Sequence, residues 1–214
     1  TLNKKKLIPK YLILEKPISN KLDEIIQIKK ILKNKIVFIN LQRIFDKNFL
    51  NLVEKNYKSL ILSYNGGLIN NGIHALSLLI YLHGYPKKIE KINSNLNNTK
   101  NKDTSYSFLL KFKNFEAVFL GYDNLKFNKF DFEFIGRNNV LLLRTGGTKN
   151  IIEKITKYPG LQNYKINVPK SIKKFRNING LKYILKSISS GKFIYYNYIN
   201  LMYESHKIIK KLKN

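Results

Sequence analysis

The sequence predicts a mixed α/β fold preceded by an N-terminal extension. Short apolar runs of strand length alternate along the chain with segments whose apolar residues recur at helical spacing. Gly and Pro residues separate many of these segments, as they do at turns. With 214 residues, of which 43% are hydrophobic, the chain can bury a sizeable core.

The extension is expected to cover residues 1–48 and to pack on the main body or reach away from it. Lys clusters alternate there with short apolar runs, and Pro9 and Pro17 interrupt the pattern. Within this part we expect a helix at 23–32 and a strand at 35–40.

In the main body, helical apolar spacing predicts helices at 49–63, 72–83 and 149–157. Gly66-Gly67 follows the first of these segments and Gly84-Tyr85-Pro86 the second, as at helix ends. Strands are expected at 87–92, 106–113, 116–120, 130–135 and 140–144. An Asn- and Lys-rich stretch at 91–103 is interpreted as a solvated loop.

The charge of the chain indicates a polyanionic partner. Forty Lys and Arg residues face 13 Asp and Glu residues, for a formal charge of +27. Such an excess repels itself in a free compact monomer. Because the charge is spread along the whole chain, it favours a protein embedded in RNA over an enzyme with one basic arm or a protein on an anionic membrane.

Composition excludes several other classes of protein. The absence of Cys excludes disulfides and thiolate zinc sites. No apolar run approaches the length of a membrane span.

Abundant Lys, Asn and Ile are typical of an AT-rich genome, such as that of an organelle. Because the N-terminus lacks the character of a transit peptide, we expect a removed address or synthesis inside the compartment.

Two Gly-anchored loops are expected in the last third of the chain. One holds Pro159-Gly160 and the other is the hydroxyl-rich segment 187–191, with Lys-rich sequence between them. Small hydroxyls, free amides and nearby ammonium groups are what proteins use to hold a nucleic-acid backbone. The sequence therefore predicts a nucleic-acid surface in this region.

From Ile155 the chain resembles the C-terminal half of the small ribosomal subunit protein 8 family. The family pattern I-S-K-P-G-x-R-x-Y is similar to ITKYPGLQNY at 155–164, which has Tyr158 as an extra residue. The pattern G-L-x-I-x-I-x-S-T-S-K-G is similar to GLKYILKSISSG at 180–191, where Ser190 replaces the usual Lys. LLIYLHGYP at 78–86 looks like the end of a family helix.

Two departures from the family stand beside these similarities. The basic N-terminal helix and its Pro-Ser motif are not recognisable in 49–72. Glu204-Ser205-His206 stands where the family has Gly-Gly-Glu.

The resemblance implies two small domains, with short helices packed on small mixed or antiparallel sheets. Residues 49–147 would form an N-terminal α/β domain with insertions, and residues 148–214 a C-terminal rRNA-binding domain. The implied function is that of a structural, non-enzymatic constituent of an organellar small ribosomal subunit, in the mitochondrial matrix in preference to a plastid-type organelle.

The implied partners are the central domain of the small-subunit rRNA and neighbouring small-subunit ribosomal proteins. No cofactor, metal, membrane or small-molecule substrate is expected. The residues expected to bind rRNA are Lys157, Pro159, Gly160, Lys170, Lys173, Lys174, Ser187, Ser189, Ser190, Gly191 and Lys192. Their cations would neutralise phosphates, which makes affinity salt-dependent.

An organellar nucleic-acid enzyme or RNA maturation factor is the alternative, and a lineage-specific ribosomal protein with accidental loop similarity is a third. An enzyme that cleaves nucleic acid would need grouped carboxylates for magnesium, and those of this chain are scattered.

Other features favour structural interpretations. RTGGTK at 144–149 lacks the spacing of a nucleotide P-loop and is interpreted as a turn. His74, His83 and His206 are far apart in sequence, so no metal role is expected. Ser187 has no His or acid nearby in sequence to activate it as a nucleophile.

Overall fold

The computed structural model describes residues 9–54, 57–92, 103–144, 149–157, 164–167, 178–191 and 197–213. Within them the strands form a two-stranded sheet and an eight-stranded sheet. The small sheet pairs β1 (Tyr11–Leu14) with β2 (Ile36–Ile39) in parallel. The large sheet has the order β10-β9-β8-β7-β3-β6-β5-β4. Its β3–β6 pair is parallel and its other pairs are antiparallel.

The strands of the large sheet are β3 (Tyr57–Asn65), β4 (Lys88–Lys91), β5 (Phe108–Lys111), β6 (Glu116–Tyr122), β7 (Phe130–Gly136), β8 (Asn139–Arg144), β9 (Lys149–Lys157) and β10 (Tyr164–Asn167). The helices are α1 (Leu22–Ile31), α2 (Gln42–Phe45), α3 (Lys47–Val53), α4 (Ile73–His83), α5 (Ile178–Ser190) and α6 (Tyr198–Lys213). A π-helical turn, Leu68–Gly72, leads directly into α4.

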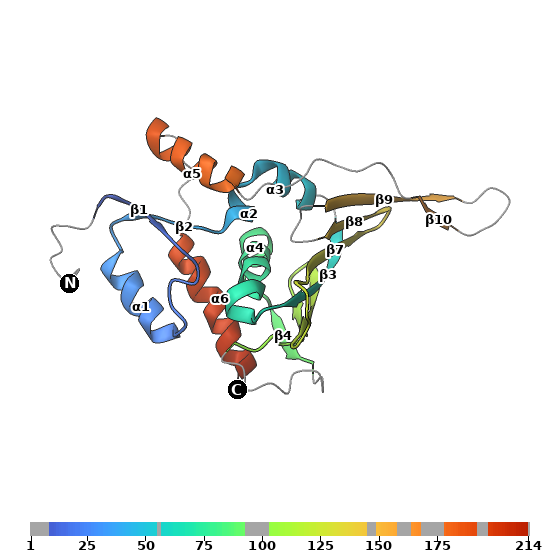
Figure 1. The fold of residues 1–214 in the computed structure, drawn as a ribbon, viewed down its shortest axis with the longest axis horizontal. Coiled ribbons are helices and arrows are strands. Elements are labelled where there is room, and N and C mark those ends of the chain that lie inside the picture. Colours follow the sequence, from blue (N-terminus) through green and yellow to red (C-terminus); the bar gives the residue numbers. More distant parts are fainter. Residues whose placement is uncertain are drawn as a thin grey trace.

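The molecule is layered, with α4 and α6 lying between the two sheets (Figure 1). The β1–α1–β2 unit packs on α6 through α1 and β2, and α6 in turn packs on α4. None of the helices in the described part of the chain is long and apolar enough to cross a membrane.

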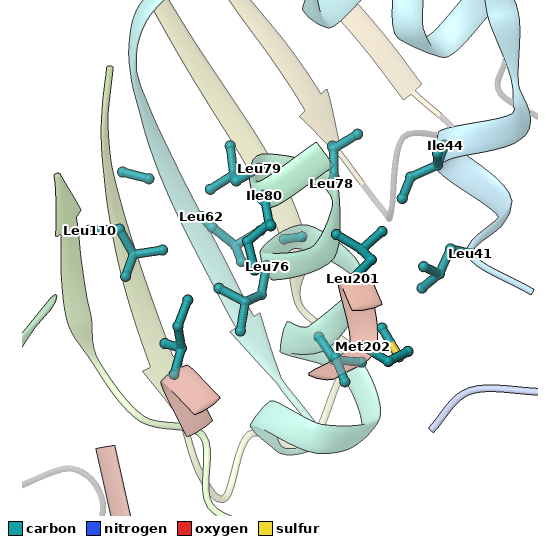
Figure 2. Close-up of a cluster of buried hydrophobic side chains, with 14 of the residues drawn as sticks. Leu41, Ile44, Leu62, Leu76, Leu78, Leu79, Ile80, Leu110, Leu201 and Met202 are labelled. Carbon is teal, nitrogen blue, oxygen red and sulfur yellow. The ribbon is translucent and has the colours of Figure 1, made fainter. Parts of the chain in front are cut away.

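The core is one cluster that runs from β2 and α2 through α6 and α4 to the large sheet. Figure 2 shows Leu62 and Leu110 of the sheet facing α4, with Leu201 and Met202 of α6 on its other side. Because α4 is enclosed in this way, its sequence is apolar on all faces. Its buried residues are Ile73, Ala75, Leu76, Ser77, Leu78, Leu79 and Ile80.

One polar contact is built into this core. The Ser77 hydroxyl of α4 lies 3.1 Å from the Ser205 hydroxyl of α6. Ser205 also donates to the carbonyl of Leu201, one turn earlier, at 2.8 Å. The two buried hydroxyls therefore have partners, and their contact joins the two central helices.

The mixed α/β class predicted from the sequence is confirmed, but two predicted helices are wrong. The first prediction, 49–63, covers α3, which ends at Val53, and β3, which begins at Tyr57. β3 lies inside the sheet between β6 and β7, and apart from exposed Lys58 all of its residues are buried or partly buried. A strand covered on both faces has a near-continuous apolar run, and such a run also fits helical spacing.

The predicted helix at 149–157 is also wrong, since this segment forms β9. Residues 149–154 of β9 pair with residues 144–139 of β8. Residues 154–157 pair with residues 167–164 of β10. Pairing with a neighbouring strand is a long-range interaction that overrides local helical spacing.

Candidate active site

A group of polar side chains lies where the two parallel strands β1 and β2 end. Glu15 and Lys16 follow β1, and Asn40 follows β2. The Glu15 carboxylate accepts a hydrogen bond from the Asn40 amide at 2.8 Å. Because parallel strands end at the same edge, these side chains are brought together, and this edge is where open α/β sheets bind ligands.

The start of α4 supplies the other half of the site. Asp103 accepts hydrogen bonds from the backbone amides of Ile69 at 2.9 Å and Asn70 at 2.8 Å. These two amides belong to the π-helical turn, whose first donors have no partner inside the helix. The Asp103 carboxylate therefore fixes the point at which the helical segment begins.

Glycine is required beside this carboxylate. Gly67 has φ +86°, in the left-handed region, and a Cβ there would lie 2.1 Å from Asp103 Oδ2. Gly72 is also constrained, since a Cβ would lie 2.6 Å from Leu68 Cδ1. The sequence GGLINNG at 66–72 thus permits a turn that larger residues would block.

Lys16 connects the two halves of the site. Its ammonium group donates to the backbone carbonyl of Asn70. Burial lowers the pKa of Lys16 and the Arg43 charge lowers it further, while the Glu15 and Asp103 carboxylates raise it. The ammonium group has three N–H donors, so it can donate to Asn70 and to a ligand at the same time.

His74 lies one turn beyond Asn70 on the same segment. Its ring meets Phe130 of β7 edge to face, with 6.5 Å between ring centroids. Burial holds the pKa of His74 well below its usual value, and the charges of Arg43 and Lys16 lower it further. His74 is therefore a neutral imidazole at neutral pH.

Arg43 of α2 is the last member of the cluster and contacts two phenylalanine rings of β7. Its guanidinium carbon lies 4.7 Å from the centroid of Phe130 and 5.7 Å from that of Phe132. Burial lowers the pKa of Arg43 to about 10, so its side chain stays charged at neutral pH. Two aromatic faces thus hold a buried cation beside the imidazole.

This arrangement can exchange a proton with an oxygen atom of a substrate. A neutral imidazole accepts a proton, and an ammonium group donates a hydrogen bond to an oxygen that gains negative charge. Within the described residues, no group of three or more His, Asp and Glu side chains could hold a metal ion. Proton transfer to and from a substrate oxygen is the chemistry that the imidazole and the ammonium group can perform.

The predicted rRNA-binding residues that the structure describes are not among the residues of this cluster. Ser187, Ser189 and Ser190 lie on α5 and Gly191 follows it, while Lys157 ends β9. The other predicted residues, Pro159, Gly160, Lys170, Lys173, Lys174 and Lys192, lie outside the described part of the chain.

The hydroxyl-rich loop predicted at 187–191 is wrong, since most of it is helix. Ser187 is buried, and the Ser189 hydroxyl donates to the Lys186 carbonyl at 3.0 Å. Gly180, near the start of the segment, packs on the backbone of Gln42, where a Cβ would lie 2.6 Å from the carbonyl oxygen. The apparent family spacing at 180–191 therefore describes a helix packed on α2.

The sequence analysis missed Lys16, Arg43 and Asn70, and it considered His74 only as a metal ligand. Two signals were present. Lys16 stands between an acid and a proline directly after an apolar run, and His74 follows GGLINNG at a helix start. Neither signal shows that these residues meet, because 54 positions separate Lys16 from Asn70.

No family model matches the chain, and no curated protein is significantly similar to it in sequence. Its fold is similar to that of several solved structures. UDP-N-acetylglucosamine 3-dehydrogenase from Acidithiobacillus ferrooxidans matches with a TM-score of 0.69 and 10% identity, over 92% of this chain and 68% of that one.

Two further structures have the same fold. A mutant 3-ketoreductase from Actinomadura kijaniata, in complex with TDP-benzene and NADP, matches with a TM-score of 0.66 and 10% identity, over 95% of this chain and 69% of that one. An NAD-binding protein from Listeria innocua matches with a TM-score of 0.64 and 15% identity, over 95% and 72%. At these identities the likeness shows the fold.

These matches overturn the ribosomal interpretation. A fold shared over 92% to 95% of the chain with oxidoreductases and a NAD-binding protein is not that of the small ribosomal subunit protein 8 family. The predictions of a ribosomal constituent, of rRNA and ribosomal proteins as partners, of no small-molecule substrate and of no enzymatic activity are wrong. The alternative of a nucleic-acid enzyme or maturation factor is overturned with them.

Replacing Asp103 by alanine should destabilise the protein by about 1–2 kcal/mol, because two amides at the helix start lose their acceptor. Urea denaturation of both proteins measures this difference. Asp23→Ala, which removes an exposed acid from the first turn of α1, is the matched control and should cost only a few tenths of a kcal/mol. Equal losses in the two variants would contradict the role of Asp103.

Stability should fall as the pH drops below about 6.5, the usual pKa of an unfolded histidine. Burial lowers the pKa of His74, His83 and His206 in the folded protein, so the unfolded chain binds more protons in this range. The stabilisation is complete above about pH 6.5. Urea denaturation at several pH values measures the slope, and His74→Gln should make it shallower. A slope unchanged by that substitution would contradict a lowered pKa at His74.

Proposed function

We propose that this chain carries the substrate-binding and proton-transferring part of an NAD(P)-dependent oxidoreductase. The observation that carries the proposal is the hydrogen bond from Lys16, which follows β1, to Asn70, one turn before His74. Through this contact the charge of Lys16 comes close enough to lower the pKa of His74, after burial and the charge of Arg43. The likeness to oxidoreductase folds supports it.

The residues present fit the reactive end of a nicotinamide cofactor. Lys16 and His74 would lie beside the nicotinamide ring, at the edge of parallel strands that commonly receives such ligands. A nicotinamide cofactor supplies or accepts the hydride. The sequence contains no G-x-G-x-x-G loop of the kind that binds a pyrophosphate. The chain spans 68% to 72% of the length of the structures it resembles. Binding of the nucleotide part of the cofactor is therefore proposed from the fold, and binding of the nicotinamide part from Lys16 and His74.

Proton transfer is the part that these side chains perform. When an alcohol carbon loses a hydride, neutral His74 takes the hydroxyl proton on a ring nitrogen. In the reverse direction protonated His74 returns this proton to the carbonyl oxygen as the carbon gains a hydride. The Lys16 ammonium donates a hydrogen bond to the same oxygen and stabilises the negative charge that develops there. The two residues thus act on one oxygen atom in both directions.

The proposed substrate is a sugar nucleotide that carries a carbonyl or hydroxyl group on its ring. Two of the similar structures are described as a UDP-N-acetylglucosamine 3-dehydrogenase and as a 3-ketoreductase with TDP-benzene and NADP. A charge of +27 would attract a ligand that carries a diphosphate.

Two earlier expectations stay predictions. The division into an extension and two small domains, with boundaries at 48 and 147, is one of them, although the second boundary falls between β8 and β9, which pair. Mitochondrial localisation is the other, and cell fractionation would test it.

Replacing His74 by Asn should lower kcat for reduction of a keto-sugar nucleotide by NADPH by about a hundredfold or more, because proton transfer is lost. Lys16→Met should lower kcat as well. His206→Asn, at a buried histidine of α6, is the matched control and should leave the ratio of kcat to KM for the folded protein near that of the parent.

The assay is oxidation of NADPH or NADH, followed by absorbance with a panel of keto-sugar nucleotides. Binding is measured separately, from the effect of each nucleotide on the His74 imidazole resonances. If neither cofactor shifts these resonances and none is oxidised, the proposed function is wrong.

A further inference from the structure

Arg43, Phe130 and His74 form a contact group beneath the proposed site. The Arg43 guanidinium lies on the face of Phe130, and the His74 ring meets the same residue edge to face. Arg43 is 8% exposed, so little water screens its charge. The cation and the imidazole therefore lie on one shared aromatic ring.

We propose that Arg43 is a positioning residue that keeps the His74 imidazole in its neutral, proton-accepting form. The inference rests on the proposed function for its catalytic consequence, but the effect on His74 is a property of the chain itself. Arg43 acts through His74 and is not proposed to contact the substrate.

The charged groups around His74 support this assignment. Lys16, at the end of β1, is the second cation that acts on His74, after Arg43. From β7, Asp131 is paired with Lys129 at 2.7 Å and with Arg144 at 3.3 Å. Asp103 caps the helix start and acts on Lys16.

The carboxylates of Asp131 and Asp103 do not cancel the effect of the two cations on His74, because both carboxylates already have partners. Asp131 already has two cationic partners, and Asp103 is hydrogen-bonded to two backbone amides. A positive charge close to an imidazole disfavours its protonated form. Burial is the largest cause of the lowered pKa of His74, and of the two cations the buried Arg43 has the larger effect.

The aromatic rings explain how an arginine is held there. Phe130 and Phe132 themselves meet edge to face, with centroids 5.1 Å apart. Both rings contact the guanidinium, whose planar shape suits stacking in a way that a lysine ammonium does not. Methionine has a similar length and can fill the space between the rings without the charge.

The experiment is an NMR titration of the three histidines in the full chain, without cofactor or substrate. Arg43→Met should raise the pKa of His74 and leave those of His83 and His206 unchanged, which gives two internal references. Lys16→Met should raise it less, and Arg43→Lys should retain much of the lowering.

Lys47→Met is the matched control. Lys47 also lies over an aromatic ring, that of Tyr183 at 5.5 Å, and its loss changes the net charge by the same amount. It should leave the pKa of His74 where it is in the parent. If Arg43→Met does not fold, Arg43→Gln takes its place and should also raise the pKa of His74. The pKa of His74 should in addition be higher in Lys16→Met than in Lys47→Met.

The outcomes separate the two proposals. If the pKa of His74 is the same in Arg43→Met and Lys47→Met, the role of Arg43 is overturned whatever the activity. If it rises in Arg43→Met while no nicotinamide nucleotide binds, Arg43 acts as inferred and the proposed function fails. In an active protein, the acid limb of the pH profile of kcat for oxidation of the alcohol, the direction in which neutral His74 accepts the proton, should move to higher pH in Arg43→Met. A merely structural loss would not cause this change.

Discussion

The position of the whole candidate site depends on the Asp103 carboxylate at the start of α4. By accepting the amides of Ile69 and Asn70, it sets where the helical segment begins. The carbonyl that receives Lys16 and the imidazole of His74 both belong to this segment. A shift of the start by one residue would rotate His74 by about a quarter of a turn, away from Phe130.

The surrounding core explains why this helix can hold a reactive residue in place. α4 is enclosed by α6 and by the large sheet, so its buried side chains fix its rotation and its height (Figure 2). The β1–α1–β2 unit packs on the opposite side of α6 (Figure 1). Lys16 directly follows Leu14 and Glu15 at the end of β1. The hydrogen bond from Lys16 to Asn70 thus joins the β1–α1–β2 unit to the segment that contains α4.

Those parts of the fold could be predicted whose helices and strands are determined by apolar spacing within their own segment of the sequence. The helix at α1, the start and end of α4, and the strands of the β5–β6 and β7–β8 hairpins agree with apolar spacing and with Gly and Pro at their ends. β3 and β9 were misassigned because their state depends on partner strands, which local spacing does not contain. The site was missed for a related reason, since it is assembled from β1, α2 and α4. The charge of +27 was an ambiguous signal, because it is compatible with RNA and with a diphosphate ligand alike.

The central claim is that Lys16 and His74 act on the same substrate oxygen. A double-mutant cycle on the reduction of a keto-sugar nucleotide tests it most directly, with Lys16→Met, His74→Asn and the double variant compared with the parent. If both residues serve one oxygen, the double variant should lose little more activity than the more damaged single variant. Losses that multiply independently, or a parent chain without measurable reduction, would contradict the account.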